Sequence, residues 1–213
     1  MSLLPQCPRC GLPLGVERAV ACPDHASVPP LWRTDGGGYD DFVAHLARAG
    51  SLPSLAPFPL GPEWAIADFG VVGHQGAPRG SYVACGAVTE TDGPVDVVVV
   101  AEEPGIGLGA RIAGLGGRDV GADLLRGPAT TRLQVDRHTV SMWALPPVER
   151  LGPDAASALG IGVLVGEADG RWLWFITRPA TAILMRPEWS LADLGQMGPA
   201  LLDLSFEGMR WSW

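Results

Sequence analysis

The 213-residue sequence is 47% hydrophobic and only 18% charged, and its net charge at pH 7 is −8. This composition excludes an intrinsically disordered chain, and its eight Trp residues indicate a folded core. All fifteen basic residues are Arg, and they form no cluster of the kind that neutralises phosphates, so we expect no general binding to nucleic acid.

The sequence predicts a cytoplasmic protein without membrane contact. The N-terminal residues MSLLPQCPRC lack a basic region followed by an apolar run, which a signal peptide needs. The uncharged stretch at residues 155–166 is too short to span a bilayer. A reducing compartment also favours thiolate metal ligands over disulfides.

Residues 1–28 carry a metal-binding motif of the form C-x2-C-x11-C-x2-H. Cys7 and Cys10 can turn back onto one ion, and the glycine that follows relieves the tight turn. Cys22 and His25 repeat the same spacing, so the segment resembles a zinc ribbon or a pair of rubredoxin-like knuckles. Four protein ligands fill a tetrahedral shell and leave no open position, which predicts one structural Zn²⁺. An iron site or a set of metal-free thiols is the alternative.

Residues 29–62 are predicted to be a connector because they are rich in Pro and Gly. One short helix is expected within them at residues 41–49, with Asp40 as its N-cap and Gly50 just beyond its C-terminus. The main domain is then expected to span residues 63–213.

The main domain begins with three predicted strands, at residues 64–73, 81–91 and 95–101. The run from Val97 to Val100 has no polar alternation, which indicates a central strand covered on both faces. Taken with the segments further along the chain, this pattern predicts an α+β protein: a mostly antiparallel β domain with few short helices, preceded by the zinc-binding head.

The segment from Glu102 to Arg111 is the most unusual in the chain, because Gly105, Gly107 and Gly109 alternate directly after the apolar strand. We interpret it as a structural turn in which Glu102 pairs with Arg111. Two alternatives remain. The backbone amides with Arg111 could bind a small anionic ligand, or the carboxylates Glu102 and Glu103 could be catalytic. The pattern matches neither a P-loop nor a dinucleotide-binding motif.

The remaining predicted elements follow in chain order. Residues 131–136 are expected to pair with 139–145, and 161–168 with 171–177 through the strong hairpin signal Asp169-Gly170. After these, the pattern predicts a short strand, a helix capped by Ser190 and a last strand, at residues 182–186, 190–194 and 201–206.

Two histidines and one further cysteine are potentially reactive, but the sequence does not combine them into a catalytic triad or dyad. His74 and His138 are expected in loops, where either could act as an acid or base, although a solvated surface group is the usual role. Cys85 lies in a predicted strand and is expected to be a buried apolar residue.

Trp172 and Trp174 alternate along one predicted strand, and Trp211 and Trp213 share that spacing. Core packing is the ordinary explanation. An aromatic surface for a partner is the alternative, and under it all four indoles are interface candidates.

Four blocks of the sequence resemble an uncharacterised family of bacterial proteins from GC-rich genomes. They are the Cys/His motif, residues 57–64 (PFPLGPEW), residues 101–115 (AEEPGIGLGARIAGL) and residues 170–175 (GRWLWF). The family is a domain of unknown function, so the resemblance implies that the chain is a single unit and adds no activity.

The sequence therefore favours a zinc-stabilised interaction or regulatory protein whose partner is another protein or a second copy of the chain. The rival hypothesis is an enzyme or small-ligand binder that uses the loop at residues 102–111.

Overall fold

The computed structural model describes residues 3–15, 21–34, 36–89, 93–116, 121, 127–148, 160–206, 208–210 and 213. Its strands are β1 Leu3–Gln6, β2 Leu31–Thr34, β3 Leu55–Phe58, β4 Ala65–His74, β5 Ala77–Thr89, β6 Gly93–Glu102, β7 Thr131–Val135, β8 His138–Val148, β9 Ile161–Ala168, β10 Arg171–Arg178 and β11 Ser190–Asp193. Its α-helices are α1 Tyr39–Ala49 and α2 Leu108–Ile112, and its 3₁₀ helices are η1 Ala180–Glu188, η2 Leu194–Gln196 and η3 Gly198–Asp203.

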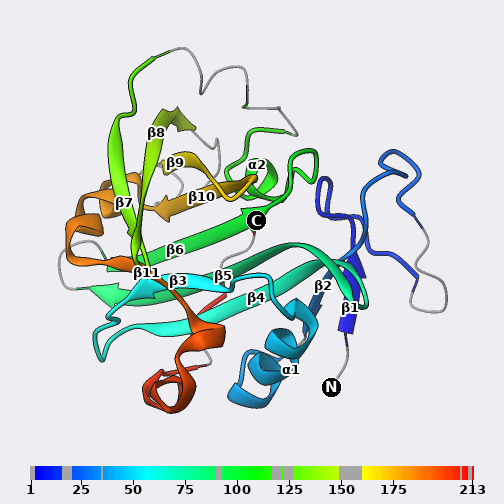
Figure 1. Cartoon of the computed structure of the whole chain (residues 1–213), viewed down its shortest axis with the longest axis horizontal. Helices are drawn as coiled ribbons and strands as arrows, with labels where there is room; N and C mark the ends of the chain where they lie inside the picture. Colours follow the sequence, from blue (N-terminus) through cyan, green and yellow to red (C-terminus); the bar gives the residue numbers. More distant parts are fainter. Residues whose placement is uncertain are drawn as a thin grey trace.

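Within these residues the strands form one sheet in the order β1-β2-β4-β5-β6-β10-β9-β8-β7-β11-β3 (Figure 1). Neighbouring strands run antiparallel, except that β11 pairs with β7 in parallel. The predicted fold class is thus confirmed: a mostly antiparallel sheet with few short helices. None of the described helices has the length and apolar character needed to cross a membrane.

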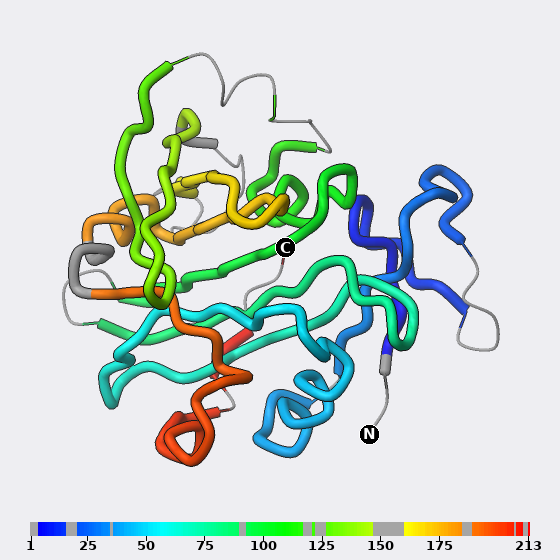
Figure 2. Tube along the Cα trace, in the orientation of Figure 1, coloured from blue at the N-terminus to red at the C-terminus, as the bar shows by residue number. Residues whose placement is uncertain are grey.

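The sheet curls so that one of its ends returns to its middle. β3 stands last in the strand order, yet it packs against β5 and β6. A hydrogen bond of 2.6 Å from Ser81 Oγ to the carbonyl of Pro53 joins the two regions. The tube in Figure 2 shows the resulting open barrel, with the N-terminal segment lying at its right-hand side.

Both faces of the central strands are buried, each by a different core. On β6, Val97 and Val99 belong to the core on the concave face, which α1 helps to close through Phe42. Val98 and Val100 belong to a second core on the convex face, which α2 covers. The prediction of a central strand covered on both sides is confirmed by the burial of all four valines.

Most of the predicted elements between residues 39 and 178 are present, with boundaries shifted by a few residues. The expected helix is α1, and Gly50 ends it with a φ of 59°, but its N-cap is Gly38 and not Asp40. The β9–β10 hairpin turns at Asp169-Gly170, as the sequence predicts.

The predictions for the C-terminal part of the chain are wrong. The expected strand at residues 182–186 is the 3₁₀ helix η1, and the helix expected from Ser190 is the strand β11. Residues 201–206 were expected to form a strand, but η3 covers their first half. Ser190–Asp193 becomes a strand because β3 and β7 offer it backbone partners on either side, which local propensity does not reveal.

Three short strands escaped prediction: β1, β2 and β3. β1 pairs with β2, which pairs with β4, so residues from the expected head and connector extend the main sheet. β3 and β2 both lie within residues 29–62, which therefore contribute to the core as well as linking its parts. Whether the head at residues 1–28 folds independently remains a prediction.

Candidate metal centre and the loop that holds it

Cys7, Cys10, Cys22 and His25 come together as a possible metal site. Their donor atoms all lie within 4.8 Å of one another. Nδ1 of His25 is 3.6 Å from the sulfurs of Cys7 and Cys22, and the sulfurs of Cys10 and Cys22 are 3.7 Å apart. None of these cysteines forms a disulfide. The arrangement can hold one metal ion with four protein ligands.

Local backbone geometry presents these four side chains. The amide of Gly11 donates to the carbonyl of Cys7 at 2.9 Å, and Gly11 adopts a φ of 77°, as the tight turn after Cys10 requires. In the second half, the amide of His25 donates to the carbonyl of Cys22 at 3.1 Å. Cys7 and Cys22 are buried while Cys10 is exposed, so the site lies at the surface with its inner half covered.

Two arginines fix this head to the Gly-rich loop after β6. Arg9, between the first two cysteines, donates from Nε to the carbonyl of Ile106 at 3.1 Å and from Nη2 to the carbonyl of Gly105. In return, Arg111 of α2 donates from Nη1 to the carbonyl of Cys7 at 3.0 Å. Each segment thus uses its own cation to bind backbone carbonyls of the other.

The close fit between head and loop depends on glycines. A Cβ atom on Gly11 would overlap the guanidinium of Arg111, and one on Gly107 would lie 3.1 Å from Cγ of Arg9. Gly109 allows α2 to approach the sheet, because a Cβ there would overlap the indole of Trp174.

Glu102 occupies the position where an anionic ligand of this loop would lie. Its carboxylate accepts hydrogen bonds from the backbone amides of Leu108 and Gly109, at 2.8 and 3.1 Å. Burial raises its pKa to about 7, although these two amides act in the opposite direction. The expected pair between Glu102 and Arg111 is not formed, since the amides at the start of α2 lie closer to the carboxylate.

A buried ion cluster lies beneath the head. The carboxylate of Asp68 on β4 is almost completely buried and pairs with Arg33 of β2, and Arg210 lies 3.9 Å from its second oxygen. The ring of Trp213 contacts both Arg33 and Arg111, with guanidinium carbons 4.7 and 4.5 Å from its centroid. The end of the described chain therefore packs against the same arginine that binds the metal head.

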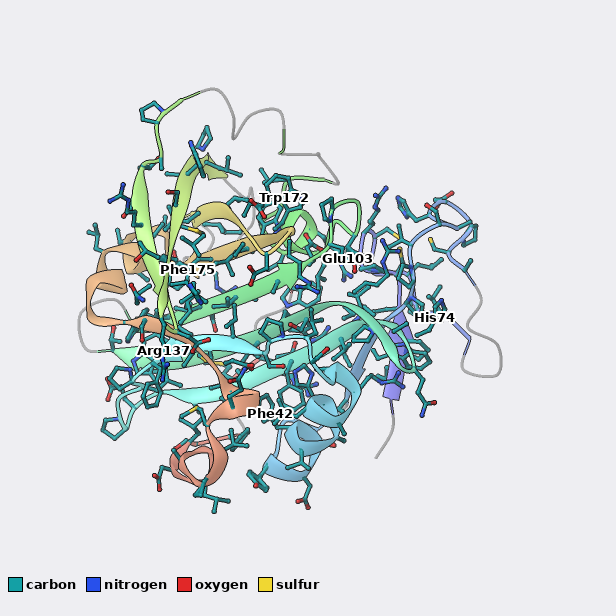
Figure 3. The ribbon with its side chains drawn as sticks, in the orientation of Figure 1. Phe42, His74, Glu103, Arg137, Trp172 and Phe175 are labelled. Atoms are coloured by element: carbon teal, nitrogen blue, oxygen red, sulfur yellow. The ribbon has the colours of Figure 1, made fainter. Side chains whose placement is uncertain are left out.

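The other expected catalytic residues do not join Glu102 in one site. Glu103 forms an ion pair of 2.7 Å with Arg79, and both side chains are partly buried. His74 is exposed at the end of β4, beside the N-terminal segment (Figure 3). His138 is also exposed, at the start of β8. Cys85 is buried in the concave core as predicted, and burial raises its pKa to about 12.

The four interface candidates divide into different environments. Trp174 is 2% exposed and packs in the convex core, so it is not available to a partner, which corrects that expectation. Trp172 and Trp213 are half-buried against the same core. Trp211 lies outside the described residues.

Sequence reasoning missed the two arginine contacts between head and loop. Arg9 lies inside the Cys-Pro-Arg-Cys motif and Arg111 inside the Gly-rich block, so each was interpreted within its own segment. A second signal was available for the ion cluster, because Asp68 interrupts an apolar strand and a buried charge requires a partner.

One protein-family model, described as a family of unknown function (DUF6758), matches residues 1–209. No curated protein and no solved structure matches the chain.

Proposed function

We propose that this chain, which belongs to the DUF6758 family of unknown function, is a cytoplasmic interaction or regulatory protein whose head is stabilised by one structural zinc ion. The observation that carries the proposal is the spacing of the four donor atoms. The cytoplasmic location rests on the thiolate ligands, which a reducing compartment preserves.

The donor spacing is compatible with zinc. Zn–S bonds of about 2.3 Å and a Zn–N bond of about 2.0 Å, in a tetrahedral shell, separate two sulfurs by about 3.8 Å and a sulfur from a nitrogen by about 3.5 Å. Three of the six separations in the cluster are close to these values, with 3.7 Å between the sulfurs of Cys10 and Cys22 and 3.6 Å from His25 Nδ1 to the sulfurs of Cys7 and Cys22, and all six lie within 4.8 Å. With four protein ligands the shell is closed, which supports a structural ion and argues against metal-bound water as a reagent.

The contacts of the Gly-rich loop favour this function over the rival one. The amides of Leu108 and Gly109 donate to Glu102, and Arg111 donates to the head. An anionic substrate at the loop would have to displace a buried carboxylate from both amides. We therefore assign the loop the role of supporting the metal head.

A partner should be recognised through the head, because the zinc ion gives this small segment a fixed surface. Full-length tagged protein can be purified from its source cells beside a Cys22→Ser variant, at two salt concentrations. We expect a protein in near-stoichiometric amount with the wild type and its loss with the variant.

The same samples should be sized by light scattering, since a second copy of the chain is the alternative partner. Wild-type protein that is recovered alone and monomeric at both salt concentrations would contradict the interaction function. It would leave the zinc site itself unaffected, because metal content is measured separately.

A further inference from the structure

A cavity opens on the concave face, on the opposite side of the sheet from the metal head. The pairing between β8 and β9 begins at Met142 and Gly166. The first residues of β8 are therefore not paired with the last residues of β9. A cavity of about 640 Å³ lies between them and extends toward β3 and β11. Its volume is in the range of sites for small organic ligands.

The wall of this cavity that belongs to the barrel interior is apolar. Leu55, Ala101 and Leu173 line it, and all three are members of the concave core. Ala101 is the neighbour of Glu102 on β6, and successive residues of a strand face opposite sides. The cavity and the Gly-rich loop are therefore separate places in the molecule.

Arg171 is the arginine of the cavity lining, and it forms no ion pair within the part of the chain that the structure describes. It follows the β9–β10 turn and shares the concave face with Leu173, two residues further along the strand. Its Nε atom is buried, and among the described residues no acceptor or carboxylate pairs with it. The Nε atom is out of reach of solvent, so a ligand in the cavity would meet the terminal N–H groups of this guanidinium, and a carboxylate is the acceptor that matches them.

Most acidic residues of the cavity, unlike Arg171, already have hydrogen-bond partners. Three of them already accept backbone N–H groups: Asp136 from Asp193, Asp193 from Ser54 and Gly195, and Glu167 from Gly170. Asp169 is exposed in the β9–β10 turn. These exposed or half-buried acids surround the cavity with negative charge, which disfavours ligands carrying two or more negative charges.

We propose that this cavity binds a small molecule with a single carboxylate on an apolar body, with the carboxylate held by Arg171 and the body on the apolar wall. The site is independent of the zinc-dependent function proposed above. It also differs in position from the loop at residues 102–111.

The test is a calorimetric titration of the full-length protein with four probes that share one chain: octanoate, octanol, octylammonium and octyl phosphate. We expect octanoate to bind saturably and to be preferred over each of the others. Arg171→Gln should weaken the binding of octanoate about tenfold, to the affinity of octanol, because the charge-assisted contact is lost. Arg132→Gln, an exposed arginine of β7, is the matched control and should bind like the wild type.

Three results would overturn the proposal: tighter binding of octylammonium than of octanoate, no saturable binding of octanoate, or equal binding by Arg171→Gln. If that variant fails to fold, the preference of the wild type for octanoate over octanol decides the question without it. A variant that loses zinc, such as Cys22→Ala, should keep octanoate binding.

Discussion

The metal head and the curved sheet bury very different amounts of apolar surface. Within the described residues up to Val28, the buried apolar side chains are those of Cys7, Cys22, Val28 and two prolines, Pro5 and Pro8. β4, β5, β6, β9 and β10, by contrast, are covered on both faces by two apolar cores. Two of these five buried side chains are metal ligands and the other three are small, so the fold of the head must depend on the ion and on contacts made elsewhere.

The difference shows why the Gly-rich block has its unusual sequence. It contributes apolar residues of α2 to the convex core, and at the same time it binds the head through Arg9 and Arg111. The block therefore connects a region stabilised by packing to a region stabilised by metal. Variants that remove metal binding and leave the apolar cores intact, or the reverse, can test this difference between the two regions.

The largest effect is expected from Cys22→Ala. Zinc binding provides on the order of 10 kcal/mol to segments of this kind, so the head should unfold and become sensitive to protease. Cys85→Ala makes the same change in the concave core and should keep both the zinc and the protease resistance of the head. Limited proteolysis with mass spectrometry locates the cleavages. If Cys22→Ala unfolds the whole chain cooperatively, the predicted boundary at residue 28 is wrong.

Removal of the buried indole of Trp174 should lower the stability of the sheet. Trp174→Ala leaves a large cavity beneath Gly109 and should lower the free energy of unfolding by about 3–5 kcal/mol. Trp172 lies on the same face but is half-buried, so Trp172→Ala should lower the free energy of unfolding by distinctly less. Urea titration of both variants measures the two effects. Equal losses would show that burial does not distinguish the two indoles.

Glu102 should make the stability of the protein depend on pH. Its pKa is raised to about 7 in the folded protein, so the folded state holds a proton that the unfolded state releases more readily. This group therefore stabilises the fold most below its unfolded pKa, and the contribution is lost as the pH rises through 7.

Between pH 6 and 8, we expect the wild type to lose about 1 kcal/mol of unfolding free energy through Glu102, relative to Glu102→Gln. Urea midpoints of the two proteins at both pH values give the difference. Identical pH dependence in the two proteins would mean that the carboxylate ionises as it does in water.

The smallest effect is expected from Arg9→Gln, which removes the hydrogen bonds to the carbonyls of Gly105 and Ile106 and leaves the ligands intact. Loss of these contacts should cost about 1 kcal/mol, so a chelator should extract the metal roughly fivefold faster. Arg137→Gln, in the exposed β7–β8 turn, is the control. An unchanged extraction rate would show that the loop does not hold the head.

The sequence allowed prediction where neighbouring residues determine structure. The ligands of the metal site lie in two local motifs of fixed spacing, and the β9–β10 hairpin has a strong turn signal at Asp169-Gly170. The four-residue strands β1, β2 and β3 include Pro5 and Pro57, and they are strands because distant partners pair with them. Pairing between distant segments leaves no local pattern.

The same reason explains what was missed at the candidate sites. The cavity is formed by residues from several separate strands and loops, and no single segment suggests it. Glu102 lies in the segment that the sequence marks as unusual, but its hydrogen-bond partners could not be identified from composition. Backbone amides are present at every residue except proline, so only the fold shows that those of Leu108 and Gly109 face the carboxylate.

The metal content of the full-length protein, purified without chelators, tests the central claim most directly. We expect elemental analysis to find about one zinc per chain in the wild type and close to none in Cys22→Ala, because four ligands form one tetrahedral shell. Cys85→Ala should retain the wild-type amount. A wild-type protein without zinc, or a Cys22→Ala variant that keeps its full complement, would contradict the assignment of Cys7, Cys10, Cys22 and His25 as the ligands.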